Sequence, residues 1–562
     1  MKKLYREFSP FFGVLLLSAL MACNGRGKRP ETVSAIDLKR GRMILCGPPD
    51  KQLGTVGFKT SCSGKAQEDF NLAIALLHSF EYDEAEKVFA KVIDEAPECA
   101  MAYWGVAMCN YHPLWNPSTP AELEKGAKAA AIAMSLEKKS QRESAYIAAI
   151  ASFYNAWDRT DHATRSRRFE KAMEKIYTAY PGDKEAAIFY ALALNGAADP
   201  VDTAFTRQRK AGRILTALYP NEPYHPGIVH YIIHSYDYPE LAALALPAAR
   251  AYASVAPSSA HAQHMPSHIF IRLGLWDEAI QSNLAATAAA KCYAESAGIK
   301  GHWDEELHGM DYLVYACLQK GENRQAKAQC RYLETISEVY PENFKVAYAF
   351  AAIPARYLLE NRLWKEAAAL KVYPPHFPWQ AYPWQRSIIH FTRLLGLVNT
   401  GNINAAKAEL KTLVRLHDTL VKQNDPYKAG QVQIQVKTAE AWILFKEGRD
   451  SEALALMSAA ADMEDHTPKH PVTPGEVLPA RELLGDMLLQ MNKPTEALHA
   501  YEASLQQRPN RFNGLYGAGL AAERRHDPGK ARRYYQQLAS MASGADRPEL
   551  KAASSFLKRH FP

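Results

Sequence analysis

From about residue 65 onwards, apolar side chains recur at the three- and four-residue spacing of amphipathic helices, and no stretch alternates as a strand does. The stretch "LLHSFEYDEAEKVFAKVIDEAPECA" (76–100) holds two such helical patterns with a short polar turn between them. Similar pairs follow along the chain. The pattern predicts an all-α protein built from antiparallel helix pairs.

The helix pairs are similar to one another in sequence. Comparable stretches are "RLGLWDEAIQSNLAA", "LQKGENRQAKAQC", "LVNTGNINAAKAEL", "LFKEGRDSEALALM" and "LLQMNKPTEALHAYEASLQQRPN". In each, a turn residue, often glycine, ends the first helix, and a small alanine allows the second helix to pack closely. Tyr82, Ala85, Phe89 and Pro97 stand at the spacing of a tetratricopeptide repeat, which all of these segments resemble.

This resemblance implies an α-solenoid, a superhelix of stacked helix pairs, over residues 65–465. The stretch "EDHTPKHPVTPGEVLPA" contains four prolines. It predicts a joint after residue 465, with further tetratricopeptide helix pairs in 466–562.

Composition and charge are those of a folded globular protein. The chain has 562 residues, 48% of them hydrophobic and 23% charged, with a formal net charge of +7. This length exceeds what one core serves, which agrees with a repeat array, and the composition excludes wholesale disorder. Because no block of like charge is present, nucleic acid is not an expected partner.

The N-terminus resembles a bacterial lipoprotein signal. Lys2, Lys3 and Arg6 precede the apolar run "PFFGVLLLSALMA", and "LMAC" resembles a lipobox with Cys23 as the acceptor. The resemblance implies a signal peptide at 1–22, a lipid anchor on Cys23 and a place in the bacterial cell envelope, facing the periplasm or on the outer membrane. Residues 23–64 are predicted to form a tether and N-terminal segment. The alternative is an ordinary signal followed by a chance cysteine.

Cysteine usage suits an exported protein with disulfides. Of the eight cysteines, Cys46 and Cys62 lie in the Gly/Pro-punctuated stretch "CGPPDKQLGTVGFKTSC", and we predict that they bond to each other. The remaining cysteines after Cys23 lie in helical patterns and are expected to be small buried side chains. The sequence has no CxxC motif, so a thiolate metal site is not indicated.

Longer segments resemble a narrower family of bacterial tetratricopeptide-repeat lipoproteins. These are "FNLAIALLHSFEYDEA", "CAMAYWGVAMCNYHPLW", "HPGIVHYIIHSYDYPELA", "HMPSHIFIRLGLWDEAI" and "KHPVTPGEVLPARELLGDMLL". They are spread over nearly the whole chain after Cys23. The resemblance implies the repeat fold and no particular activity.

Histidines are concentrated in the middle of the chain. In a tetratricopeptide superhelix, the first helix of each pair lines the concave groove. Leu241, Ala279 and Ala326 set the register of three successive pairs, and the inward positions of their first helices are then His230, His234, His261, His264, His268, His308 and Asp311. The spacing of His261, His264 and His268 puts them on one helical stripe.

Neutral imidazoles with one carboxylate suit Zn, Fe, Ni or Cu, so the sequence predicts a candidate transition-metal site. We expect its ligands among His230, His234, His264, His268, His308 and Asp311. Asp237 is interpreted as a helix cap or a group behind a ligand. Three alternatives remain: the rings cap helices, they line a polar groove for an anionic or peptide ligand, or Pro266 delays the helix start and disrupts the stripe.

The same register puts further polar side chains in the groove. These candidate groove-binding residues are His261, Tyr315, Arg356, Glu482 and Asp486. The sequence therefore predicts a membrane-anchored scaffold whose groove binds a protein, a peptide or a small ligand. The alternative is a metal-dependent enzyme, a hydrolase or an oxygenase. Neither a Gly-rich phosphate loop nor a nucleophile elbow is present.

Overall fold

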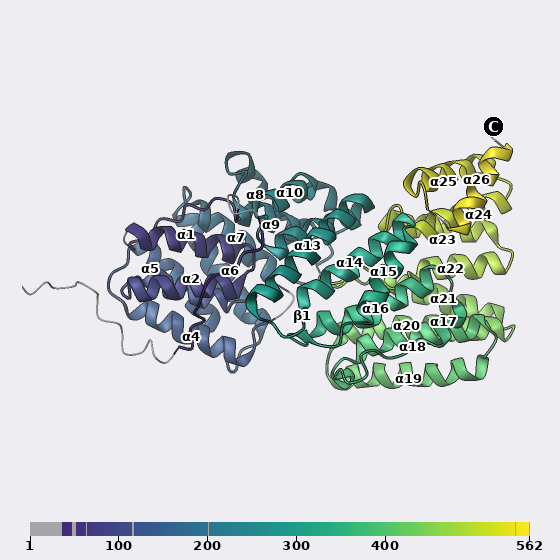
Figure 1. Cartoon of the computed structure of the whole chain (residues 1–562), viewed down its shortest axis with the longest axis horizontal. Helices are drawn as coiled ribbons and strands as arrows, with labels where there is room; N and C mark the ends of the chain where they lie inside the picture. The colour runs from purple at the N-terminus through teal and green to yellow at the C-terminus, as the bar shows by residue number, and fades with distance from the viewer. Residues whose placement is uncertain are drawn as a thin grey trace, which may run out of the picture.

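The protein is an elongated stack of antiparallel helix pairs, as its computed structural model shows (Figure 1). The structure describes residues 36–47, 52–62, 64–114, 117–200, 202–545 and 547–560. The predicted signal peptide and Cys23 lie outside these residues. The all-α solenoid prediction is confirmed. No helix among the described residues is long and apolar enough to cross a membrane.

The first half of the stack runs from one end of the molecule to its middle (Figure 1). Its helices are α1 (Gly64–His78), α2 (Tyr82–Glu95), α3 (Ala100–Cys109), α4 (Pro120–Ser135), α5 (Gln141–Tyr154), α6 (His162–Ala179), α7 (Lys184–Gly196), α8 (Thr206–Leu218), η2 (Tyr219–Asn221), α9 (Pro226–Tyr236), α10 (Ala242–Val255), α11 (Ala260–His264), α12 (Pro266–Leu273) and α13 (Trp276–Ala297).

The second half continues to the C-terminal end. Its elements are β1 (His302–Trp303), α14 (Asp304–Lys320), α15 (Asn323–Leu333), β2 (Val339–Tyr340), α16 (Phe344–Glu360), α17 (Trp364–Ala368), η3 (Trp379–Ala381), α18 (Pro383–Asn399), α19 (Ile403–Lys422), α20 (Pro426–Lys446), α21 (Asp450–Asp465), α22 (Ala480–Gln490), α23 (Pro494–Gln507), α24 (Phe512–Arg524), α25 (Pro528–Met541) and α26 (Pro548–His560). β1 and β2 pair in parallel, with His302 opposite Val339.

The six predicted repeats share one turn geometry. After the first helix of each pair, one residue takes a positive φ and turns the chain back. These residues are Phe80, Gly274, Gly321, Gly401, Gly448 and Asn492. At Gly274 a side chain is also excluded by space, because a Cβ there would lie 2.5 Å from the carbonyl oxygen of Pro509. A left-handed residue satisfies the last carbonyls of the helix, so these local residues determine where each pair folds back.

The second helix of each pair packs through its alanine. The six alanines are fully buried: Ala85, Ala279, Ala326, Ala406, Ala453 and Ala497. A side chain this small allows two helix backbones to approach closely. The repeat register derived from these alanines therefore holds in three dimensions.

Residues 36–47 and 52–62, which we call the strap, lie over the first helices. Phe58 is fully buried. Its ring lies 5.1–6.3 Å, centroid to centroid, from four aromatic rings, those of Phe70, Trp104, Tyr146 and Phe189. The strap therefore contributes to the core of the first repeats.

The predicted disulfide between Cys46 and Cys62 is wrong, because Cys46 bonds to Cys292 and Cys62 bonds to Cys99. Between the two cysteines the strap runs along other loops, where Thr55 N–H donates to Tyr224 O at 2.9 Å. This path brings Cys46 to α13 and Cys62 to the start of α3. The path of the strap therefore determines which cysteines are close enough to bond, and their separation along the chain does not.

Peptide mapping without reduction is expected to recover two cross-linked species, one joining the peptides of Cys46 and Cys292 and one joining those of Cys62 and Cys99. Both species should disappear after reduction. A cross-link between Cys46 and Cys62 would contradict the observed path of the strap.

Residues 466–479, where the sequence predicts a joint, connect α21 to α22 and pack against α16 and α18. Arg356 of α16 donates from its guanidinium to the carbonyl oxygens of Gly475 and Glu476, at 2.8 and 2.6 Å. Lys469 forms an ion pair with Asp237 at 3.2 Å. This inner segment, residues 466–479, therefore covers the concave face.

His470 anchors the inner segment by its ring. It packs against the rings of Phe344, Trp384 and Tyr427, and its Nδ1 accepts from Val472 N–H at 3.2 Å. Burial, with the positive charge of Lys469 second, lowers the pKa of His470 to about 3. The imidazole is therefore neutral in the folded protein at neutral pH.

Acid is expected to weaken the folded state through His470. An unfolded histidine binds its proton near pH 6.5, and folded His470 does so only near pH 3, so its contribution is complete above pH 6.5 and is lost as the pH falls towards 3. Between pH 7 and pH 4.5, His470→Gln should therefore lose about 2–3 kcal/mol less stability than the wild type in urea unfolding. His466→Gln, at an exposed position of the same segment, is the control. Equal losses in His470→Gln and the wild type would contradict the prediction.

Candidate metal centre

Four helices bring six histidines together on the inner side of the superhelix. α9 carries His230 and His234, and α14 carries His308. The other three histidines lie on α11 and α12, and they are His261, His264 and His268. Met265, between α11 and α12, keeps helical angles (φ −54°, ψ −35°). Pro266 occupies the first turn of α12, where proline is tolerated. The helical stripe is therefore continuous.

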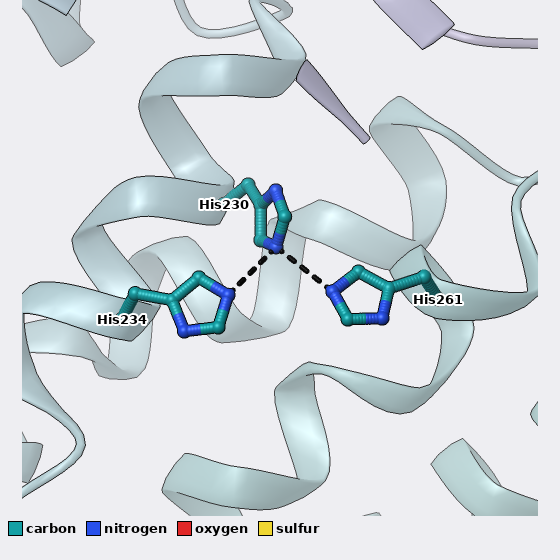
Figure 2. A group of neighbouring side chains, drawn as sticks. All are labelled: His230, His234 and His261. Atoms are coloured by element: carbon teal, nitrogen blue, oxygen red, sulfur yellow. Dashed lines mark hydrogen bonds between the residues drawn. The ribbon is translucent and has the colours of Figure 1, made fainter. Parts of the chain in front are cut away.

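The first group, which we call triad 1, consists of His230, His234 and His261 (Figure 2). The Nε2 atoms of His234 and His261 lie 2.9 and 3.1 Å from Nε2 of His230. His230 is fully buried, whereas His234 and His261 are partly exposed. Three rings thus point the same nitrogen at one place.

The tautomer of His230 explains what this arrangement can bind. Its Nδ1 lies 2.6 Å from the carbonyl oxygen of His78, which only accepts, so Nδ1 carries the hydrogen. In the neutral ring, Nε2 then has one lone pair, which accepts one hydrogen bond and cannot serve both neighbouring rings. A metal ion between the rings would accommodate all three nitrogens, because two nitrogens about 2.1 Å from a tetrahedral zinc ion lie about 3.4 Å apart.

The second group, triad 2, consists of His264, His268 and His308, all buried. Nε2 of His264 lies 3.1 Å from Nε2 of His268, and the rings of His264 and His308 lie 4.3 Å apart, centroid to centroid. Tyr312 lies beside all three rings. Triad 2 therefore has a closed, aromatic wall.

Asn283 and Asp237, which lie behind the rings, determine the tautomers of His264 and His268 in triad 2. Nδ1 of His264 donates to Oδ1 of Asn283 at 2.8 Å, and the Asn283 amide donates to Ala279 O, which fixes its orientation. Nδ1 of His268 donates to a carboxylate oxygen of Asp237 at 3.0 Å. Both Nε2 atoms therefore present lone pairs to each other. A carboxylate behind a histidine is a common support for a metal ligand.

Burial lowers the pKa of every ring in both triads, and in triad 1 a neighbouring histidine is the next cause for His230, His234 and His261. The rings are therefore neutral near pH 7. A neutral imidazole is the form that binds metal ions.

The structure corrects the predicted set of ligands in two ways. Asp311 is not one of the converging groups, because it accepts from Arg356 at 3.1 Å. His261, predicted to bind a ligand in the groove, is a member of triad 1. Asp237 lies behind His268 and at the C-terminal cap of α9, so both of its interpretations hold.

The other predicted groove residues do not face an open groove. Arg511 donates to Tyr315 and forms an ion pair with Glu482, and all three side chains are buried. Arg356 is fully buried under the inner segment. Asp486 forms an ion pair with Arg362. The prediction that Tyr315, Arg356 and Glu482 bind a ligand in a groove is therefore wrong, since these residues bind other parts of the chain.

A third cluster was not predicted. The carboxylate of Glu185 accepts from Nε2 of His78 and of His225, each at 3.0 Å, and Tyr231 donates to Nδ1 of His78. These bonds satisfy the carboxylate and the His78 ring without a metal ion. The three residues lie on α1, α7 and before α9, so no sequence spacing signals them. The carbonyl of His78 in turn orients His230.

Comparison with known proteins supports the repeat assignment. A tetratricopeptide repeat profile matches residues 70–112 and 483–547. Both segments are therefore similar to tetratricopeptide repeats. No curated protein matches the chain.

Solved helical structures match at low identity. The human IFIT1 dimer with PPP-AAAA is 11% identical, with 84% of this chain and 90% of that chain covered at a TM-score of 0.33. Naa15/Naa10 bound to HypK-THB is 12% identical, with 88% and 91% covered at 0.24. The P58(IPK) TPR domain is 12% identical, with 88% and 99% covered at 0.18. At such identity the likeness concerns the fold alone.

Proposed function

We propose that this tetratricopeptide-repeat protein binds transition-metal ions through triads 1 and 2. The observation that carries the proposal is the convergence of Nε2 lone pairs whose tautomers are fixed from behind, by His78 O, Asn283 and Asp237. Without a cation, the lone pairs of His264 and His268 face each other at 3.1 Å, and the single lone pair of His230 faces two ring nitrogens at 2.9 and 3.1 Å. Imidazole ligands suit Zn, Fe, Ni and Cu.

Catalysis is the second candidate function. Three protein ligands leave a coordination position for water or substrate, as in catalytic metal sites. His234 and His261 are partly exposed, whereas all three residues of triad 2 are buried, so triad 1 is the more accessible of the two. This access favours a metal-dependent enzyme, a hydrolase or an oxygenase, over a purely structural metal.

Elemental analysis of the full chain, purified without a polyhistidine tag, tests the proposal. We expect at least one equivalent of a transition metal, and its loss in a His230→Ala/His268→Ala double variant. His390→Gln/His417→Gln, which changes two histidines outside both triads, should keep the metal. Absence of metal from the wild type after incubation with Zn²⁺, Fe²⁺, Ni²⁺ and Cu²⁺ would overturn the proposal.

The wider role that we propose is a scaffold in the bacterial cell envelope, anchored through a lipid on Cys23. Because the inner segment covers Arg356, a protein, peptide or small-ligand partner would contact other surfaces of the superhelix. Growth with a fatty-acid analogue that carries a clickable tag should label the wild type and not Cys23→Ala. Labelling of Cys23→Ala would refute the anchor at this position.

A further inference from the structure

We propose that the two triads together hold a pair of copper ions, a dinuclear centre that binds dioxygen. The inference rests on the metal binding proposed above and goes beyond it in the number of ions, their identity and their ligand. It is carried by the adjacency of the triads, by the all-imidazole ligand set and by the charges around it.

The triads adjoin because they share one helical stripe. His261 of triad 1 and His264 of triad 2 are three residues apart on a continuous helix, so their Cβ atoms lie about 5–6 Å from each other. Each triad is completed from the flanking inner helix, α9 on one side and α14 on the other. Two ions bound here are neighbours rather than independent sites.

The carboxylates of Asp237 and Asp311, which lie near triad 2, are both engaged away from its metal-facing nitrogens. The carboxylate of Asp237 faces Nδ1 of His268 and is neutralised by Arg272 at 2.9 Å and Lys469 at 3.2 Å. Asp311 is neutralised by Arg356. The six direct ligands of the two triads are all imidazoles.

Beyond the rings, Lys345 faces two carboxylates and Asp237 faces two cations, so these charges balance as a set. Lys345 forms ion pairs with Asp304, at 2.7 Å, and with Glu305. Glu81 accepts from the Ser259 hydroxyl at 2.6 Å. The surroundings thus supply little negative charge to offset bound cations.

This charge balance favours monovalent copper. Two dications among neutral ligands would repel each other about four times as strongly as two monocations at the same separation, because the energy follows the product of the charges. Imidazole is also a suitable ligand for copper. A pair of Cu(I) ions therefore fits this pocket better than a pair of Zn²⁺ or Fe²⁺ ions.

The pair has a specific chemistry with dioxygen. Each Cu(I) gives one electron and becomes Cu(II), and one O₂ takes both electrons and becomes O₂²⁻ held between the ions. The balance needs no further reductant for this single step. The partly exposed side of triad 1, at His234 and His261, is the route by which O₂ enters from solvent.

Anaerobic titration of the full chain with Cu(I), in competition with bicinchoninate, tests the number of ions. We expect two per wild-type chain and one in each of two variants, His230→Gln/His234→Gln and His264→Gln/His268→Gln. The matched control, His390→Gln/His417→Gln, should bind two. Circular dichroism checks that each variant is folded, and His308→Gln replaces the second variant if that one is not.

Electron paramagnetic resonance after exposure to air tests whether the ions are a pair. Two coupled Cu(II) ions should give far fewer than two spins per wild-type chain, whereas each triad variant should give about one spin per chain. Two full spins in the wild type, or a single bound copper, would overturn the dinuclear centre. If the wild type binds a metal other than copper, the copper pair is refuted and the proposed metal binding stands. If it binds no metal at all, both proposals are refuted.

Discussion

Replacing Arg511 with methionine is expected to lower the free energy of unfolding by about 3–5 kcal/mol, because it leaves two buried carboxylates without their cationic partner. The guanidinium is fully buried and forms ion pairs with Glu360 at 2.5 Å and with Glu482 at 2.6 Å. It also donates to the Tyr315 hydroxyl at 3.0 Å. These partners belong to α14, α16 and α22, so one side chain joins three helices of the superhelix.

Urea unfolding at pH 7 measures this loss, with Arg362→Met as the control. Arg362 also pairs with a carboxylate, that of Asp486 at 2.9 Å, but its side chain is 39% exposed. An exposed pair contributes about 0–1 kcal/mol, so the control should be nearly as stable as the wild type. Equal unfolding midpoints for Arg511→Met and the wild type would show that the buried network is not needed for stability.

Replacing Asp237 with asparagine is expected to weaken metal binding by about 10–100-fold, as loss of a group behind a metal ligand commonly does. The Asp237 carboxylate accepts from Nδ1 of His268 and so directs the Nε2 lone pair towards His264. An amide in its place also donates, which no longer selects that tautomer. Competition with a chromophoric chelator measures the dissociation constants of the two proteins.

Asp311→Asn is the matched control for this variant. Asp311 is likewise buried and paired with an arginine, and it contacts none of the six rings in any described hydrogen bond or ion pair. It should therefore lose stability through Arg356 and retain the wild-type metal affinity. A similar loss of affinity in both variants would assign the effect to general destabilisation.

The histidine clusters were partly predictable, for a local reason. The spacing of His261, His264 and His268 puts three rings on one stripe, and the repeat register brings α9 and α14 to face it. The division into two triads was not predictable. It depends on ring orientations imposed from behind by His78 O and Asn283, which lie on other helices.

The sequence by itself determined the class of fold and the register of the repeats. A positive-φ turn such as Gly321 and a buried alanine such as Ala326 act within about a dozen residues, so their pattern is visible along the chain. The tertiary structure alone decided which distant groups meet. Cys46 reaches Cys292 across 246 residues, and Arg356 reaches the carbonyl of Glu476 across 120. Such contacts depend on how the whole superhelix stacks, and no local spacing carries that information.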